Sequence, residues 1–263
     1  MRILVCFKAV YDMEHITPLE LCRLRDGEME LSLFQRKWGN YDEGALENGL
    51  RMLEAAKKAG ELVDLHGVTV EERDPKFGGD LYALGFERIT YLQVNCDITY
   101  RPEIVAEALG SYVEAQGGYD MILMGKQAGM GENGITPYLL AERLEMPCVS
   151  GVYSLEKTHE GIKVVSQTDG KIVERLIKRP TIYIIGEAEH PYLRTATLRE
   201  KLNAKKREIH HMQMDVGDTV VNSPEYMGMR YEFHQKQCAM IQGDSVEEKA
   251  DKLWDGLKKW VVK

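Results

Sequence analysis

Short apolar runs alternate with longer amphipathic stretches over the first 150 residues. The apolar runs are continuous, which is typical of parallel strands covered on both faces; they lie at 3–7, 65–70, 89–94 and 121–124. Between them, apolar residues recur at helical spacing after Asn40 and Pro102, and a short helix is expected at 80–84. This β-α-β-α order predicts a mainly parallel sheet with helices on both faces.

Capping signals mark three helix starts. Asn40 and Glu43 have the spacing of a capping box, as do Ser245 and Glu248. In Thr136-Pro137, a good N-cap residue precedes a proline suited to the first helical position. The helix that begins at Ser245 carries one apolar stripe, which ends at Trp260.

The pattern changes after Pro147. Strand-like runs lie at 151–156, 162–167, 172–177 and 181–186. Asp169-Gly170 is a hairpin signal, so the sheet is expected to gain an antiparallel extension here. Residues 209–240 have weak periodicity and are expected to form an extended excursion. We therefore divide the chain into an α/β domain, 1–208, and a C-terminal arm, 209–263. The arm either packs on another protein or folds back on its own domain.

Composition excludes some classes of protein. The chain has 263 residues, 44% hydrophobic and 29% charged, as in ordinary globular proteins, and its net charge of -8 argues against nucleic-acid binding. Its five cysteines include no CxxC pair, which favours reduced thiols and a cytoplasmic setting. The apolar run at 3–7 is too short for a membrane span, so no transmembrane segment is expected.

The most informative stretch is the glycine-rich segment 125–137, which follows an apolar strand and ends at a helix start. Ligands of open α/β sheets bind beyond the carboxyl ends of the strands, and glycines let backbone N–H groups approach a phosphate. The segment is neither a Walker A loop nor GxGxxG, so a flexible loop without a ligand is the alternative.

Catalytic or metal-binding groupings do not emerge from the pattern. The seven histidines are scattered, and the adjacent His210 and His211 would point to opposite sides of an extended chain. Cys6 is expected in the core, and Glu71 and Glu72 are expected to be solvated at a strand end. The segment 194–207 is basic within an acidic chain: it is either a solvated helix face or a docking segment in which Leu198 is an apolar anchor.

Four segments, in matching order, resemble the beta subunit of electron-transfer flavoproteins. They are the start ILVCFKAVYD, the stretch NYDEGALE from Asn40, the stretch YDMILMGKQA from Tyr119, and Ala196-Thr197-Leu198 through Lys206. The family motif for the second of these is Asn-Pro-Tyr-Asp-Glu-x-Ala-Leu-Glu. The tail from Met240 to Ala250 also fits, so the likeness covers nearly the whole chain.

This resemblance implies an α/β fold of the adenine-nucleotide-binding type and an electron carrier rather than an enzyme. It also implies a heterodimer with an alpha subunit that holds FAD, and docking of an acyl-CoA-type or other flavin dehydrogenase at Leu198. The beta pocket would hold AMP, or the ADP part of a second FAD in electron-bifurcating members. The implied cofactor residues are Ala9, Asp12, Asn40, Asp42, Gly67, Gly125, Gln127, Ala128, Gly131, Glu132, Asn133, Gly134 and Thr136.

Three departures fall in the glycine-rich loop: Met130, Ile135 and Pro137 stand where the family usually has Asp, Gln and Gly. Pro137 removes a backbone N–H at the helix start. The segment Asp74–Gly79 also looks like an insertion into a turn that is compact in the family. Two further hypotheses stay open: a stand-alone adenine-nucleotide-binding regulator of the same fold, and a structural subunit that has lost its nucleotide.

Overall fold

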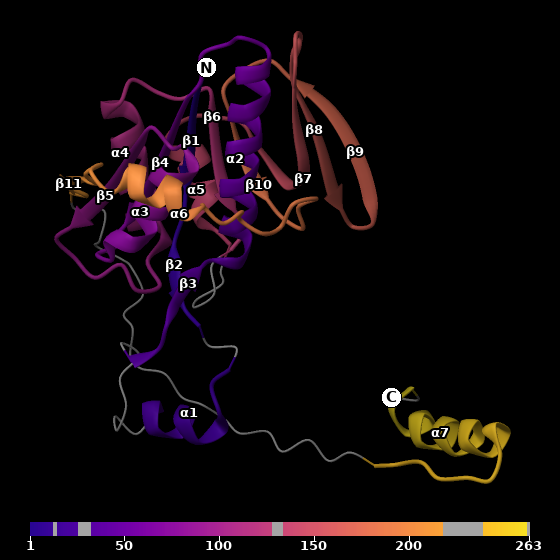
Figure 1. Ribbon diagram of the computed structural model, residues 1–263. Coiled ribbons are helices and arrows are strands. Elements are labelled where there is room, and N and C mark those ends of the chain that lie inside the picture. The colour runs from indigo at the N-terminus through magenta and orange to yellow at the C-terminus, as the bar shows by residue number, and fades with distance from the viewer. Residues whose placement is uncertain (13–14, 26–32, 128–133, 218–238, 262–263) are drawn as a thin grey trace. The chain divides into compact units, whose positions relative to one another are not determined.

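The computed structural model describes residues 1–12, 15–25, 33–127, 134–217 and 239–261 (Figure 1). The chain divides into two compact units, Met1–Gly228 and Met229–Lys263. The strands of the first unit are β1 (Arg2–Cys6), β2 (Ala9–Tyr11), β3 (Arg36–Trp38), β4 (Asp64–Val70), β5 (Arg88–Val94), β6 (Met121–Gly125), β7 (Cys148–Thr158), β8 (Gly161–Thr168), β9 (Lys171–Ile177), β10 (Thr181–Ile185) and β11 (His210–Met214). Its helices are α1 (Pro18–Arg25), α2 (Asn40–Lys58), α3 (Pro75–Leu84), α4 (Pro102–Ala115), α5 (Thr136–Arg143) and α6 (Leu198–Ala204).

One large sheet organises this unit. Its nine strands run in the order β11-β5-β4-β1-β6-β10-β7-β8-β9, and all neighbours from β11 to β7 are parallel. The β7-β8 and β8-β9 pairs are antiparallel, which confirms both the mainly parallel sheet and its antiparallel extension. A separate two-stranded antiparallel sheet joins β2 to β3.

Helices cover both faces of the sheet, as the continuous apolar runs predict. The core beneath α2 and α3 includes Ile3 and Val5 of β1 and Phe7, which directly follows that strand. Leu4 and Cys6, which point the other way, contribute to the core beneath α4 and α5. Side chains alternate across a strand, so an uninterrupted apolar run fills both cores at once.

The strands after Pro147 do not all belong to the extension. β10, which includes residues of the expected run at 181–186, lies between β6 and β7 and is parallel to both. The sheet also continues past residue 208, where we expected the domain to end. β11 pairs in parallel with β5, so the sheet takes up residues 210–214 of the segment that we expected to be an excursion.

α2 and α5 begin at Asn40 and Thr136 as predicted, but their N-cap residues were predicted wrongly. Gly39, not Asn40, is the N-cap of α2, and no side chain caps that end. Ile135, not Thr136, is the N-cap of α5, so Thr136 is the first helical residue. By contrast, Asp74 caps α3 by accepting a 2.9 Å hydrogen bond from the Lys76 backbone N–H, and this helix takes in most of the segment that looked like an insertion.

The second unit contains α7 (Val246–Val261), the helix predicted at 245–260. The Ser245 hydroxyl accepts a 3.1 Å hydrogen bond from the Glu248 backbone N–H, as predicted for a cap. The Glu248 carboxylate accepts a 2.9 Å hydrogen bond from the Asp244 N–H, whereas in a complete capping box it would accept one from the Ser245 N–H. The apolar stripe, with Leu253, Trp254 and Leu257, is exposed.

Candidate functional site

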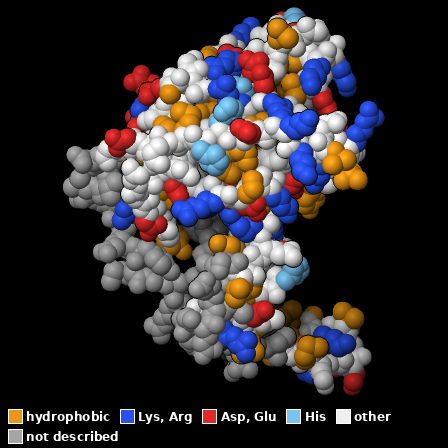
Figure 2. Space-filling model, turned by 60° about the vertical axis from the view of Figure 1, so that its left-hand side comes forward, with side chains coloured by type: hydrophobic (Ala, Val, Ile, Leu, Met, Phe, Trp, Pro, Cys, Tyr) orange, Lys and Arg blue, Asp and Glu red, His pale blue; other side chains and the backbone are white. Residues whose placement is uncertain are grey.

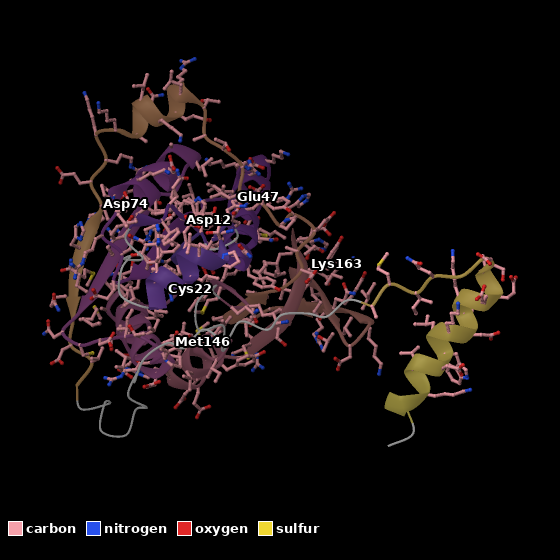
Figure 3. The ribbon with its side chains drawn as sticks, turned by 90° about the horizontal axis from the view of Figure 1, so that it is seen from below. Asp12, Cys22, Glu47, Asp74, Met146 and Lys163 are labelled. Atoms are coloured by element: carbon pink, nitrogen blue, oxygen red, sulfur yellow. The ribbon has the colours of Figure 1, made fainter. Side chains whose placement is uncertain are left out.

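The candidate site lies where the sheet changes direction. From β1 the chain builds outward to β4 on one side and later returns to β6 on the other, so the switch point lies between β1 and β6. In open α/β sheets, ligands bind in the crevice outside the carboxyl ends of the strands at such a point. Lys8 and Lys126 both follow these strand ends and are exposed, which places positive charge at the rim of the crevice. Figure 3 views the chain from this edge and labels Asp12 there.

Asp42, in the first turn of α2, contacts the backbone at the ends of both strands. It is 7% exposed, and its Oδ2 accepts a 2.9 Å hydrogen bond from the Lys8 backbone N–H. Burial raises the pKa of Asp42 to about 7, against the opposite effects of the Lys8 and Gly125 N–H groups and the Lys8 charge. The carboxylate that the resemblance assigns to the cofactor therefore bonds to the protein backbone.

Glycine is required at two positions around Asp42. A Cβ added at Gly125 would lie 2.3 Å from Oδ1 of Asp42 and 2.8 Å from its backbone nitrogen. A Cβ at Gly39 would lie 2.5 Å from Oδ2 of the same side chain. Gly125 thus lets α2 approach the end of β6, which is a packing role beside any role toward a phosphate.

The assignment of Asn40, at the start of α2, to the cofactor site needs a correction. Asn40 is exposed. Counted back from Tyr41-Asp42-Glu43, the asparagine of the family motif falls on Gly39 and its proline on Asn40. The helix cap is indeed at Gly39, so this chain lacks an asparagine side chain at that position.

Ala9 and Asp12 lie on or just after β2, close to the crevice. The Ala9 carbonyl accepts a 2.9 Å hydrogen bond from Arg36 Nη2, and Asp12 forms a 3.4 Å ion pair with Lys37. Gly67 is inside β4, not after it, and a Cβ there would lie 2.8 Å from the Ile89 side chain. Gly67 therefore serves the core between α3 and the sheet, away from the strand ends.

The glycine-rich loop is described only at its two ends. Ala128, Met130, Gly131, Glu132 and Asn133 lie outside the described residues. At the far end, Gly134 has a φ of +62°, which glycine adopts without strain.

The start of α5 has few backbone donors to offer a ligand. The Tyr138 and Leu139 N–H groups both donate to the Ile135 carbonyl, at 3.0 and 3.1 Å, and Pro137 has no N–H. A phosphate at this helix start would therefore find fewer donors than helix N-termini usually provide.

Arg36 and Glu72 form a part of the site that the sequence pattern missed. Glu72, expected to be solvated, is 2% exposed and also accepts hydrogen bonds from the backbone N–H groups of Arg73 and Asp74. Arg36 binds its two carboxylate oxygens from β3. Trp38, also on β3, packs edge-on against Phe77 of α3, with ring centroids 4.7 Å apart. The small sheet is thus fixed over the carboxyl ends of β1 and β4.

The candidate docking segment is a short helix on a firmly held loop. Leu198 is the first residue of α6 and is 76% exposed, beneath a complete capping box between Thr197 and Glu200. Arg194, at the start of the basic segment, is held by Glu47 of α2 at 2.5 Å and also pairs with Glu54. On the face seen in Figure 2, hydrophobic side chains lie in small groups among Lys and Arg.

Two further negative findings concern the described residues alone. Within them, no group of three or more His, Cys, Asp or Glu side chains is placed to hold a metal ion. Nor does any helix there have the length and apolar character needed to cross a membrane.

Comparisons with known proteins agree on one family. A model of the electron transfer flavoprotein domain matches residues 40–208. The chain is 26% identical over 257 residues to the "Putative electron transfer flavoprotein subunit YgcR" of Escherichia coli, covering 97% of this chain and 96% of that protein. It is 23% identical over 216 residues to the "Electron transfer flavoprotein subunit beta" of Bacillus subtilis, covering 82% and 80%.

Proposed function

Because this chain belongs to the electron transfer flavoprotein family, we propose that it is the beta-type subunit of a heterodimer that carries electrons through flavin. Family membership and the likeness to a subunit named beta support the electron-carrier role and the pairing with an alpha-type subunit. In this proposal the chain is a carrier subunit and not a catalyst on its own.

The crevice between the ends of β1 and β6 is the proposed site of an adenine nucleotide, either AMP or the ADP part of FAD. The observation that carries this proposal is that the glycine-rich segment follows β6 in the sequence at the switch point of the sheet, where Lys8 and Lys126 are exposed just after the two strand ends. Lysine is a common phosphate ligand, and Thr136 adds a hydroxyl at the start of α5. FAD, where bound, supplies the electron-accepting isoalloxazine, while the chain supplies binding and orientation.

Two surfaces would serve partners. The exposed stripe of α7, with Leu253, Trp254 and Leu257, would pack on the alpha-type subunit. The exposed Leu198 and Leu202 on α6 would enter an apolar pocket of a flavin dehydrogenase, with Arg199 and Lys205 at the rim. An apolar anchor surrounded by charge is typical of interfaces in which a few residues supply most of the affinity.

The test is purification of the chain with its alpha-type subunit, followed by absorbance and mass spectrometry of the molecules released on denaturation. We expect a flavin spectrum and either one FAD plus AMP or two FAD per heterodimer. A complex without flavin after gentle purification with added FAD would overturn the electron-carrier role. Flavin without any second nucleotide would overturn the proposed beta pocket and favour a subunit that has lost its nucleotide.

A further inference from the structure

Among the residues that the structure describes, the ends of β1 and β6 share no ladder bond beyond their last pair. The ladder between β1 and β6 stops at the pair Cys6 and Met124. Beyond it, the Phe7 N–H donates to Val68 of β4 at 3.0 Å, and the Lys126 N–H donates to Ile185 of β10 at 2.8 Å. The ends of β1 and β6 therefore bond to opposite neighbours, and no ladder bond joins them at the mouth among these residues.

Asp42 spans this gap. Its carboxylate accepts the Lys8 N–H from the β1 side, and the Gly125 N–H from the β6 side acts on the same carboxylate. The start of α2 is held in the same place, because the Gly39 N–H donates to the Lys8 carbonyl at 2.9 Å. One side chain thus ties together a helix start and two strand ends that are far apart in sequence.

The space around the carboxylate is fully used. Added Cβ atoms at Gly39 and Gly125 would each approach an Asp42 oxygen within 2.5 Å, so neither side chain nor solvent separates these groups. An ionised carboxylate only accepts hydrogen bonds, whereas an asparagine offers one acceptor and a donating NH₂ group. An asparagine in the same position would therefore place its NH₂ group against one of the two N–H groups.

The ionised form costs folding free energy near neutral pH. Burial is the main cause that raises the pKa of Asp42, from 3.8 to about 7. The folded state thus binds the proton more tightly than the unfolded chain, and this contribution to stability is lost as the pH rises from about 4 through 7. Among the groups that face Asp42, Lys8 favours its charge, while the buried Cys6 thiol is itself made harder to ionise by Asp42. Burial is the main cause that lowers the pKa of Lys8; the charge of Asp42 opposes this shift, and the charge of Arg36 adds to it.

We propose that Asp42 is a positioning residue of the crevice: its ionised carboxylate holds the ends of β1 and β6 at the spacing that nucleotide binding requires, without being a ligand of the nucleotide. This inference rests on the proposed nucleotide site. In it, Asp42 controls nucleotide binding through the backbone N–H groups at the two strand ends. Protonation removes one of the two acceptors, so the crevice loosens, and nucleotide affinity falls, as the pH drops below about 7.

The test compares the wild-type chain with Asp42→Asn and with Asp120→Asn. Asp120 is a matched control, because its exposed carboxylate accepts the Arg2 N–H at 2.7 Å at the opposite end of β1. The first measurement is hydrogen exchange of the Lys8 and Gly125 amides, which needs no nucleotide. The second is calorimetric titration with AMP at pH 6 and pH 8. Ionisation of AMP itself is common to the three proteins and cancels in the comparison.

We expect Asp42→Asn to speed exchange of both amides about tenfold or more and to weaken AMP binding about tenfold at pH 8, while Asp120→Asn does neither. Between pH 8 and pH 6, the wild type and the control should lose about tenfold more affinity than Asp42→Asn, because a carboxyl with a pKa near 7 is about one-tenth ionised at pH 6. Equal exchange rates and parallel pH profiles in all three proteins would overturn the positioning role.

The two proposals can fail separately. If the wild type binds no AMP at either pH, the proposed AMP pocket fails. The exchange rates still decide whether Asp42 holds the ends of β1 and β6 together. If Asp42→Asn does not fold, the wild type alone decides. Its Lys8 amide should lose about tenfold protection between pH 8 and pH 6, after correction for the intrinsic pH dependence of exchange, and unchanged protection would overturn the proposal.

Discussion

Arg36 and Glu72 hold the β2–β3 sheet against the carboxyl end of β4 through a two-pronged ion pair, with N–O distances of 2.5 and 2.8 Å. Glu72 is buried, and Arg36 also lies over the rings of Tyr11 and Phe77. Planar, two-pronged pairing is specific to arginine, because lysine presents a single point charge. This pair therefore fixes one wall of the proposed nucleotide site.

Replacing Arg36 by methionine should destabilise the fold by about 3 kcal/mol, since it leaves the buried Glu72 carboxylate without its cation. The measurement is urea unfolding at pH 7. Lys37→Met, on the same strand, is the control: its pair with Asp12 is partly exposed at 3.4 Å and should contribute less than about 1 kcal/mol. Similar losses of unfolding free energy in both variants would show that the Arg36 pair stabilises the fold no more than the Lys37 pair does.

Gly125→Ala should destabilise the fold by about 1–3 kcal/mol, because the new Cβ would lie 2.3 Å from Oδ1 of Asp42 and force α2 away from β6. The melting temperature and the affinity for AMP should both fall. Gly79→Ala is the comparison, because nothing lies within 4 Å of an added Cβ there and alanine favours the helix. The interpretation fails if Gly125→Ala is as well tolerated as Gly79→Ala.

The sheet and its helices could be predicted because burial on two faces leaves a local signal. The continuous apolar run at β1 reveals both cores, since alternate side chains enter each. The place of β10 between β6 and β7 left no such signal, because strand order depends on contacts distant in sequence. The same holds for β11, whose polar sequence covers the edge beside β5.

Errors in the site came from polar residues whose partners are remote. Glu72 looked solvated because its partner, Arg36, lies 36 residues away. Asn40 looked like a helix cap because the spacing to Glu43 is correct, but the tight approach of Asp42 to Lys8 leaves room only for glycine at the cap. Gly67, expected after the strand, lies inside β4 and makes room for Ile89. Spacing alone could not separate these outcomes.

His66 gives the fold an acid sensitivity at the amino end of the sheet. Burial is the main cause that lowers the pKa of His66 to about 4, with the charges of Arg88 and Arg2 adding to it, and its Nδ1 lies 2.9 Å from the Tyr119 hydroxyl. Because the folded pKa lies below 6.5, this group favours the folded state above pH 6.5, and its contribution, up to about 3 kcal/mol, is lost as the pH falls toward 4.

His66→Gln should therefore flatten the loss of stability between pH 6.5 and pH 4, measured as melting temperature against pH. Asp42 acts in the opposite direction over part of this window, so the informative quantity is the difference in slope between variant and wild type. His159→Gln is the control, since this side chain is exposed and should leave the slope unchanged. If His66→Gln has the wild-type slope, the histidine does not control the acid response.

Leu198→Glu should leave stability within about 0.5 kcal/mol of the wild type, because the side chain is already in water. Electron transfer between the heterodimer and a flavin dehydrogenase should fall at least tenfold, since truncation or charging of a central anchor typically costs 2 kcal/mol or more, roughly. Leu62→Glu, at another exposed leucine far along the chain from α6, is the control for added charge. Equal rates in both variants would remove Leu198 from the docking surface.

Trp254→Glu on α7 should leave the melting temperature of the isolated chain unchanged, because this side chain is half exposed. Assembly with the alpha-type subunit should weaken about 100-fold, since the variant would lose an aromatic side chain that the proposed heterodimer buries. Sedimentation or size measurement of the mixed subunits checks this. Asp255→Lys, the next residue, is the control for a changed charge. Unchanged assembly of the tryptophan variant would show that α7 packs elsewhere.

Among the strands that the structure describes, β9 is the last of the large sheet, and this bears on how the chain behaves when it is produced alone. A strand at a sheet border has unpaired N–H and C=O groups that can template aggregation, and Ile172 and Leu176 add exposed apolar surface there. Lys171, Glu174 and Arg175 interrupt that surface with charge, as gatekeepers do. We therefore expect replacement of these three charged residues by apolar ones to lower the soluble yield of the chain in a bacterial expression host.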